Sequence, residues 1–126
     1  QEQLLPQIPT ISIEDFAKIE VLVGKVVGAT NKEGSEKLIR LVVNFGPAAA
    51  KAMAGEGGER IIFTGVRGFG YTPEDFLNKQ FFFITNLAYR KMMDEESQGM
   101  ILAVDGSDKK PQFISAEGMS VGSRIR

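Results

Sequence analysis

The chain has 126 residues, 43% of them hydrophobic, with no cysteine, no histidine and a formal net charge of −1 at neutral pH. This length suits one domain whose core needs no covalent cross-links. Without cysteine there is no disulfide, thiolate catalysis or cysteine-based zinc site, and without histidine the commonest general base is missing. No apolar stretch is long enough to span a membrane, and the first residues do not form a signal peptide, so we expect a cytoplasmic location.

The first 11 residues predict an extended arm or linker, because Pro6 and Pro9 break any helix. Since the chain begins with Gln rather than Met, we expect a trimmed protein or a domain of a longer one. Ser12 and Asp15 have the spacing of a helix capping box, which predicts a short helix from that point.

Alternating apolar residues and turn signals predict several strands after this helix. Residues 20–29 are rich in valine and contain Gly24 and Gly28, which suggest bends or bulges in a strand. Residues 37–45 place apolar side chains at every second position, as expected for a strand with one buried face. Strands are also expected at 59–66, 80–87 and 98–105, with a short one at 113–118. Residues 31–36 and 106–112 read as turns, and 46–58 as a loop rich in glycine and alanine.

A second capping box, with Thr72 as cap, Pro73 at the first helical position and Asp75 closing it, predicts a short helix between the third and fourth strands. This order of elements is that of the OB-fold, a five-stranded Greek-key barrel. We therefore predict an all-β chain: a five-stranded OB-fold barrel with a short helix between strands three and four and a short N-terminal helix. The fold alone does not give the function.

Three local patterns could carry chemistry, but each has a simpler interpretation. The glycines of residues 65–70 match neither the phosphate-loop pattern G-x-x-x-x-G-K-[ST] nor the dinucleotide-binding pattern G-x-G-x-x-G, and they favour a turn. Asp94, Glu95 and Glu96 could bind a hard cation, although a solvated acidic turn is the better interpretation. Ser97 and Lys91 could pair as nucleophile and base, but no third group orients them in the sequence.

Basic residues gather in two segments that an OB-fold would bring to one rim. Lys32, Lys37 and Arg40 lie around the connection of the first two strands, and Arg90 and Lys91 follow the fourth strand. In OB-folds these two connections flank the usual oligonucleotide-binding face. Scattered solubilising charge is the alternative, and a groove that follows a phosphate backbone is the functional hypothesis.

The segment after the fourth strand also offers groups that recognise bases. Asn86 and Gln98 carry paired donors and acceptors suited to base edges. Tyr89, Met92 and Met100 offer apolar faces for bases, or for the protein's own core. The acidic turn between them would limit binding to arbitrary polyanions.

Four stretches resemble one known family: DFAKIEVLVGKVV, GSEKLIRLVVNFG, TGV and YTPEDFLNKQFFFITNLAYRKMMDEESQGMILAV. They are similar to the tRNA-binding OB domain found at the C-terminus of methionyl-tRNA synthetase, as its separate beta subunit, and in free-standing tRNA-binding proteins. The resemblance covers residues 12–126, and its most specific part is NLxxRKMxxxxSQGMxLA. We therefore expect residues 1–11 to be an arm or linker and residues 12–126 to be the tRNA-binding domain.

The resemblance implies a non-catalytic module that binds tRNA largely by shape and supports the synthetase, with no catalytic residue, metal, cofactor or small-molecule substrate. It implies a homodimer or an attached synthetase catalytic region, with the arm and the final VGSRIR at the interface or in a linker. The alternative within the same family is a secretion-type chaperone that binds unfolded polypeptide through exposed apolar residues. The resemblance assigns tRNA contact to Lys37, Asn86, Arg90, Lys91, Met92, Ser97, Gln98 and Met100.

Two features depart from the family. The loop GPAAAKAMAGEGGE is longer than usual at its position, and the overall charge is acidic for a tRNA binder.

Overall fold

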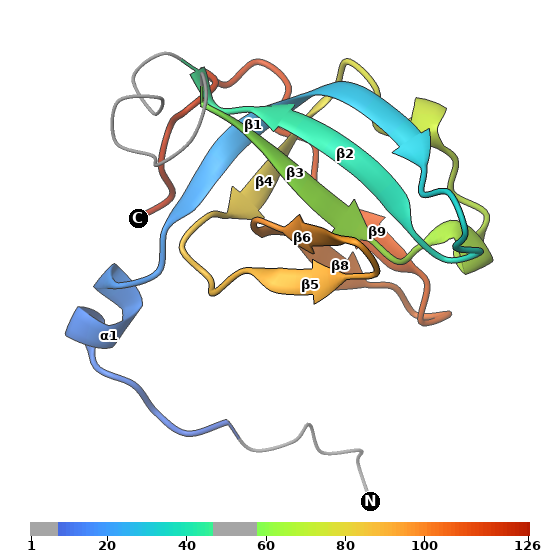
Figure 1. The fold of residues 1–126 in the computed structure, drawn as a ribbon. Coiled ribbons are helices and arrows are strands. Elements are labelled where there is room, and N and C mark those ends of the chain that lie inside the picture. Colours follow the sequence, from blue (N-terminus) through green and yellow to red (C-terminus); the bar gives the residue numbers. More distant parts are fainter. Residues whose placement is uncertain (1–7, 47–57) are drawn as a thin grey trace, which may run out of the picture.

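A five-stranded antiparallel sheet forms the body of the computed structural model, which describes residues 8–46 and 58–126. The sheet has the order β3-β2-β1-β4-β7 and curls into a barrel (Figure 1). Most of the expected 46–58 loop, and most of the 1–11 arm, lie outside the described residues. The five strands are β1 (Val21–Asn31), β2 (Ile39–Asn44), β3 (Glu59–Thr64), β4 (Gln80–Ile84) and β7 (Met100–Ile101). The predicted OB-like barrel is confirmed.

The alternating pattern of the second strand gives the buried face that the sequence predicts. Ile39, Leu41, Val43 and Phe45 are all 0% exposed. Phe45 meets Phe83 of β4 edge to face, with the ring centroids 5.6 Å apart. Burial of these side chains away from water supplies the main driving force for closing the barrel.

The two glycines of β1 have different roles. The register with β2 shifts between Val26 and Gly28, so Gly28 lies at a bulge as predicted. At Gly24 a Cβ atom would lie 2.6 Å from Val43 Cγ1, closer than atoms can pack. Gly24 therefore allows β1 to pack against the core rather than bend.

The short N-terminal helix α1 (Ile13–Ala17) stands away from the barrel (Figure 1). The Ser12 Oγ accepts from the Asp15 N–H at 3.1 Å, as predicted. The Asp15 carboxylate does not complete the box but accepts from Lys18 Nζ at 3.3 Å. No residue of α1 is buried. Arg124 near the C-terminus donates to the carbonyl oxygens of Ala17 (2.9 Å) and Ile19 (3.2 Å), so the C-terminal segment is bound to the end of α1.

Two 3₁₀ helices, η1 (Arg67–Phe69) and η2 (Pro73–Asp75), connect β3 to β4, and η2 is the short helix predicted after Thr72. The predicted capping box is present, with the Thr72 N–H donating to Asp75 Oδ2 at 2.8 Å. The helix stops after one turn because Asn78 takes a positive φ of 65° and donates its N–H to the Val26 carbonyl.

The C-terminal third differs from the sequence prediction in three places. The connection after β4, expected as a loop, contains a hairpin of β5 (Arg90–Met92) and β6 (Glu95–Ser97). The strand expected at 98–105 divides into β7 and β8 (Ala103–Asp105), because β7 pairs with β4 whereas β8 turns away to pair with β9 (Pro111–Phe113). The final strand, β9, lies earlier in the sequence than the strand expected at 113–118. Within the described ranges, no helix is long and apolar enough to cross a membrane.

Candidate nucleic-acid interface

The β5–β6 hairpin has two faces of different character. Cross-strand partners share a face, and they are Arg90 with Ser97, Lys91 with Glu96, and Met92 with Glu95. Alternation along each strand therefore puts Arg90, Met92, Glu95 and Ser97 on the face towards the barrel, and Lys91 and Glu96 on the outer face. The neighbouring cations Arg90 and Lys91, which the sequence suggested as a pair, point to opposite sides.

Ser97 and Gln98 are bound to β3 and help to close the barrel. The buried Ser97 hydroxyl accepts from the Phe63 N–H and donates to the Gly99 carbonyl, both at 3.1 Å. Gln98 exchanges two bonds with Ile61: its N–H donates to the Ile61 carbonyl at 2.8 Å, and its Oε1 accepts from the Ile61 N–H at 2.9 Å. The Ser97 hydroxyl is thus engaged on the barrel side, away from Lys91, so the structure does not assemble the nucleophile–base pair.

Asn86 is likewise engaged within the chain. Its Oδ1 accepts from the Glu20 N–H at 2.8 Å, and its Nδ2 donates to the Lys18 carbonyl. The side chain thereby fastens the end of β4 to the segment between α1 and β1. The amide groups of Asn86 and the Oε1 of Gln98 serve the fold here, whereas the sequence suggested that they read base edges.

Sequence reasoning missed Arg60, which holds both ends of the connection that carries the hairpin. Its Nη1 donates to the carbonyl oxygens of Thr85 (2.6 Å) and Gln98 (2.9 Å), and its guanidinium lies 5.7 Å from the centroid of the Tyr89 ring. A cation at the start of the apolar strand ERIIFT was the available signal.

Two cations expected in the groove, Lys32 and Arg40, are held by carboxylates from the hairpin. Glu95 accepts from Arg40 Nε at 3.0 Å and Nη2 at 3.1 Å, and from Lys32 Nζ at 2.8 Å. Asp94 accepts a further contact from Lys32 Nζ at 2.6 Å. Asp94 and Glu95 of the acidic turn are therefore paired with the protein's own cations.

These contacts shift the ionisation of all three titrating partners. Hydrogen bonds from Arg40, and then from Lys32, lower the pKa of Glu95 below its ordinary value. The Lys32 ammonium, followed by a backbone hydrogen bond, lowers the pKa of Asp94. Hydrogen bonds to Asp94 and then Glu95 raise the pKa of Lys32. Each group is therefore held in its charged form at neutral pH.

A small cleft of about 140 Å³ opens between the hairpin and the barrel. It is mainly apolar and has Arg90 in its wall. Its size matches one nucleobase or one apolar side chain. Met100, one of the lining residues, is 45% exposed. The lining residues are Phe63, Leu87, Ala88, Arg90, Met92, Ser97, Gly99 and Met100.

The eight residues assigned by resemblance therefore fall into two groups. Lys37, Arg90, Lys91 and Met100 are exposed, and Met92 is half-buried in the cleft wall. Asn86, Ser97 and Gln98 are hydrogen-bonded within the fold. The structure thus gathers Arg90, Met92 and Met100 around one cleft, and places the second group where it supports that surface.

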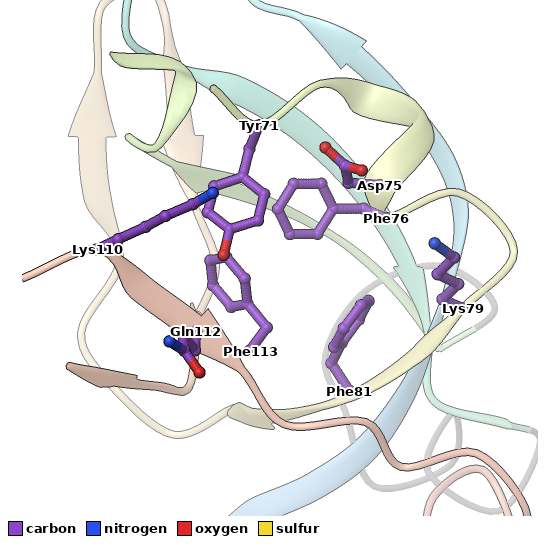
Figure 2. Close-up of a pocket in the computed structure, with 8 residues that line it drawn as sticks. All are labelled: Tyr71, Asp75, Phe76, Lys79, Phe81, Lys110, Gln112 and Phe113. Atoms are coloured by element: carbon purple, nitrogen blue, oxygen red, sulfur yellow. The ribbon is translucent and has the colours of Figure 1, made fainter. Parts of the chain in front are cut away.

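A larger pocket of about 420 Å³ lies on another part of the barrel, between η2 and β9 (Figure 2). The rings of Tyr71, Phe76, Phe81 and Phe113 gather around it. The Tyr71 hydroxyl donates to the Pro111 carbonyl at 2.5 Å, and Lys110 Nζ lies 4.8 Å from the centre of the Tyr71 ring. Because the rings around it pack on one another and the Tyr71 hydroxyl already has a partner within the chain, this pocket is a weaker candidate for a binding site.

Comparison with known proteins shows the family of the chain. The family model described as "Putative tRNA binding domain" matches residues 21–124. The methionine–tRNA ligase of Ralstonia nicotianae is 40% identical over 107 residues, which are 85% of this chain and 14% of that protein. The chain thus spans only a small part of the length of such relatives.

Solved structures share the whole barrel. The MetRS-related protein from Pyrococcus horikoshii has a TM-score of 0.80 and 32% identity, covering 94% of this chain and 100% of that one. The CsaA chaperone protein from Picrophilus torridus has a TM-score of 0.77 and 19% identity, covering 93% and 100%, and shows likeness of fold alone. With the family model spanning nearly all of the barrel, the chain belongs to the tRNA-binding domain family and is related to the corresponding region of methionyl-tRNA synthetases.

Proposed function

We propose that this chain is a non-catalytic module that binds tRNA largely by its shape and works with a methionyl-tRNA synthetase catalytic region. One observation carries the proposal: the β5–β6 hairpin presents Arg90 beside an open apolar cleft and Lys91 on its outer face. Cations can contact phosphates, and the cleft can receive a base, so the surface combines the two elements of RNA recognition.

The spread of the charges supports recognition by shape rather than by sequence. The exposed side chains of Lys37, Arg90 and Lys91 come from two connections and from both faces of the hairpin. Such an arrangement fits phosphates that a folded RNA holds apart, whereas the amides best suited to base edges are bound within the protein. Binding should therefore depend on tRNA structure more than on tRNA identity.

The test is the tRNA affinity of the chain at about 50 and 200 mM salt, beside the Arg90→Ala/Lys91→Ala variant. With roughly four phosphates contacted, affinity should fall about 50- to 150-fold between these salts, and the variant should show a shallower salt dependence. A matched control is Lys25→Ala/Lys79→Ala, which removes two exposed cations near the start of β4. Salt-insensitive binding, or equal losses in both double variants, would reject the hairpin as the tRNA-binding surface.

We also propose that the chain pairs with a second copy, or with the synthetase region, through α1 and the C-terminal tail. Ile13 is 72% exposed, Phe16 40% and Ile125 40%, and they line a pocket of about 350 Å³. A surface this apolar is usually covered by a partner. Light scattering should give a dimer mass for the isolated chain and a monomer mass for Phe16→Asp; a monomer of the unaltered chain at high concentration would reject the dimer.

Binding of unfolded polypeptide is a second candidate function, favoured by the exposed apolar side chains near the cleft. Leu87, Tyr89, Met93 and Met100 are 42–51% exposed. Methionine-rich surfaces adapt to varied apolar partners. If an unfolded polypeptide displaces bound tRNA at equal concentration, this function takes precedence; if it does not, the tRNA function stands alone.

A further inference from the structure

The carboxylate of Glu95 occupies a site with the geometry of a phosphate site. Arg40 directs Nε and Nη2 at its two oxygens like a fork, and Lys32 adds an ammonium at 2.8 Å. A forked guanidinium beside an ammonium binds a phosphate as readily as a carboxylate. Arg40 and Lys32 come from the same rim that would face the RNA backbone.

We propose that Glu95 is an internal ligand that competes with an RNA phosphate for Arg40, so that the Glu95 side chain is a latch which bound RNA displaces. This inference rests on the proposed tRNA function and deepens it. It assigns a phosphate site to Arg40 and gives the acidic turn a defined role in binding.

The contact is open enough to be exchanged. The side chains of Arg40 and Glu95 are 33% and 31% exposed, so water and salt weaken their attraction. Glu95 lies at the turn end of the three-residue strand β6, whose other end is held to β3 through Ser97, so exchange needs a rotation of the Glu95 side chain and leaves the hairpin attached to the sheet. When Glu95 leaves, Lys32 still has Asp94 at 2.6 Å, whereas Arg40 becomes free for a new anion.

A second carboxylate beside Arg40 would make the latch ineffective, because it could hold the guanidinium after Glu95 has left. The described residues place no second carboxylate in an ion pair with Arg40. Among residues 8–46 and 58–126, the carboxylate paired with Arg40 is that of Glu95. Glu96, the next residue, lies on the outer face and has no ion pair within the same ranges. The two glutamates therefore differ in contact but not in charge, which makes them a matched pair.

The latch also gives a reason for selectivity. A single phosphate binds Arg40 only if Arg40 gives up its contact with Glu95, so the net gain in binding free energy is small. A folded RNA that also meets Lys37, Arg90 and Lys91 opens the latch with the binding energy of the other contacts. Short flexible polyanions, which fill these positions one at a time, should bind poorly.

The experiment measures tRNA affinity and its salt dependence for the unaltered chain, Glu95→Gln, Glu96→Gln, Arg40→Ala and Glu95→Gln/Arg40→Ala, with thermal unfolding of each. Glu95→Gln frees the Arg40 guanidinium, so it should tighten tRNA binding about 3- to 10-fold near 50 mM salt. The slope of the logarithm of affinity against the logarithm of salt concentration should become steeper by about one. Glu96→Gln should gain clearly less. In the double variant the gain should disappear, because the phosphate no longer finds Arg40.

The outcomes separate the two proposals. If the unaltered chain does not bind tRNA, the proposed function fails. If it binds and Glu95→Gln is unchanged, weaker, or no tighter than Glu96→Gln, the latch is wrong and Glu95 only positions the hairpin or adds general negative charge. A gain that persists without Arg40 would also overturn it. Thermal unfolding of each Gln variant well above the assay temperature ensures that affinities refer to folded protein.

Discussion

The hairpin face and the aromatic pocket beside η2 use similar residue types in opposite ways. Both contain cations and apolar side chains, and both border a cavity; Figure 2 shows the aromatic one. In the pocket, Phe76 is 1% exposed and its ring lies 5.1 Å from Phe113 and 5.8 Å from Phe81, centroid to centroid. At the hairpin, Met93 and Met100 are half-exposed and Arg90 faces an open cleft.

The difference teaches that a hollow is not a site by volume alone. The larger pocket is surrounded by rings that pack on one another, and the Tyr71 hydroxyl and the Asp75 carboxylate beside them have partners within the chain. The smaller cleft lies between side chains that remain available to a ligand, namely Arg90 and Met100. We therefore expect changes in the pocket to affect stability, and changes at the hairpin to affect binding.

The largest expected effect is on stability, from Phe76→Ala in the pocket. Removing this buried ring should cost about 3–5 kcal/mol of unfolding free energy. The tRNA affinity of the folded fraction should not change. Urea unfolding and titration with tRNA measure the two effects separately.

Phe69→Ala is the matched control, because Phe69 is 47% exposed on η1. It should change the unfolding free energy by less than about 0.5 kcal/mol. If Phe76→Ala remains well folded yet loses tRNA affinity, the division between a structural pocket and a binding hairpin is wrong.

Arg60→Ala should affect both properties and so tests where the two regions meet. The change leaves the carbonyl oxygens of Thr85 and Gln98 without their shared donor, which should cost about 2–4 kcal/mol. Because these carbonyls lie at the two ends of the connection that carries the hairpin, the hairpin should lose its position and tRNA affinity should fall as well. Unfolding and binding are measured on the same preparation.

Arg60→Lys distinguishes position from charge. It keeps the positive charge but loses the planar guanidinium, whose Nη1 donates to both carbonyls and which lies beside the Tyr89 ring. We expect Arg60→Lys to lose affinity nearly as much as Arg60→Ala. Full recovery in the Lys variant would mean that Arg60 acts as a phosphate contact and not as a support.

The barrel could be predicted from the sequence because its signals are local. The apolar alternation of β2 predicts one buried face, and Thr72 with Asp75 predicts a cap; both are present. The division of residues 98–105 into β7 and β8 could not be predicted this way, because it depends on which part of the segment pairs with β4 and which part pairs with β9. Local patterns do not contain that information.

The candidate site was predictable in location but not in its internal bonds. The sequence places basic and amide residues on two connections, yet it does not show that Asn86 binds the backbone of Glu20 or that Glu95 binds Arg40. These contacts join residues 66 and 55 positions apart. Side-chain partners at such separations follow from the closed barrel, so they emerge only with the fold.

Single changes at Arg90 and Lys91 sharpen the comparison within the hairpin itself. Arg90 lines the cleft, whereas Lys91 lies on the outer face opposite Glu96. We expect Arg90→Ala to weaken tRNA binding about 5- to 10-fold, and Lys91→Ala about 2- to 3-fold, since each loses one phosphate contact but only Arg90 also borders the base-sized cleft.

Filter binding at one low salt concentration measures both variants, with Lys25→Ala as a control for the loss of one exposed cation. The reverse order, with Lys91 dominant, would place the RNA on the outer face of the hairpin and would exclude the cleft.

The smallest expected effect is the pH dependence of the contact between Glu95 and Arg40. The pKa of Glu95 lies below its ordinary 4.5, chiefly because Arg40 donates to its charged form. The stability that this pair contributes is therefore complete above about pH 4.5 and is lost as the pH falls through the lowered pKa. The unfolding free energies of the unaltered chain and Glu95→Gln should differ at pH 6 and converge in stronger acid.

Carbon-13 NMR titration of the Glu95 carboxyl should show its pKa rising towards 4.5 in Arg40→Ala. If the pKa stays low without Arg40, then Lys32 holds the carboxylate instead, and a phosphate at Arg40 would not need to displace Glu95.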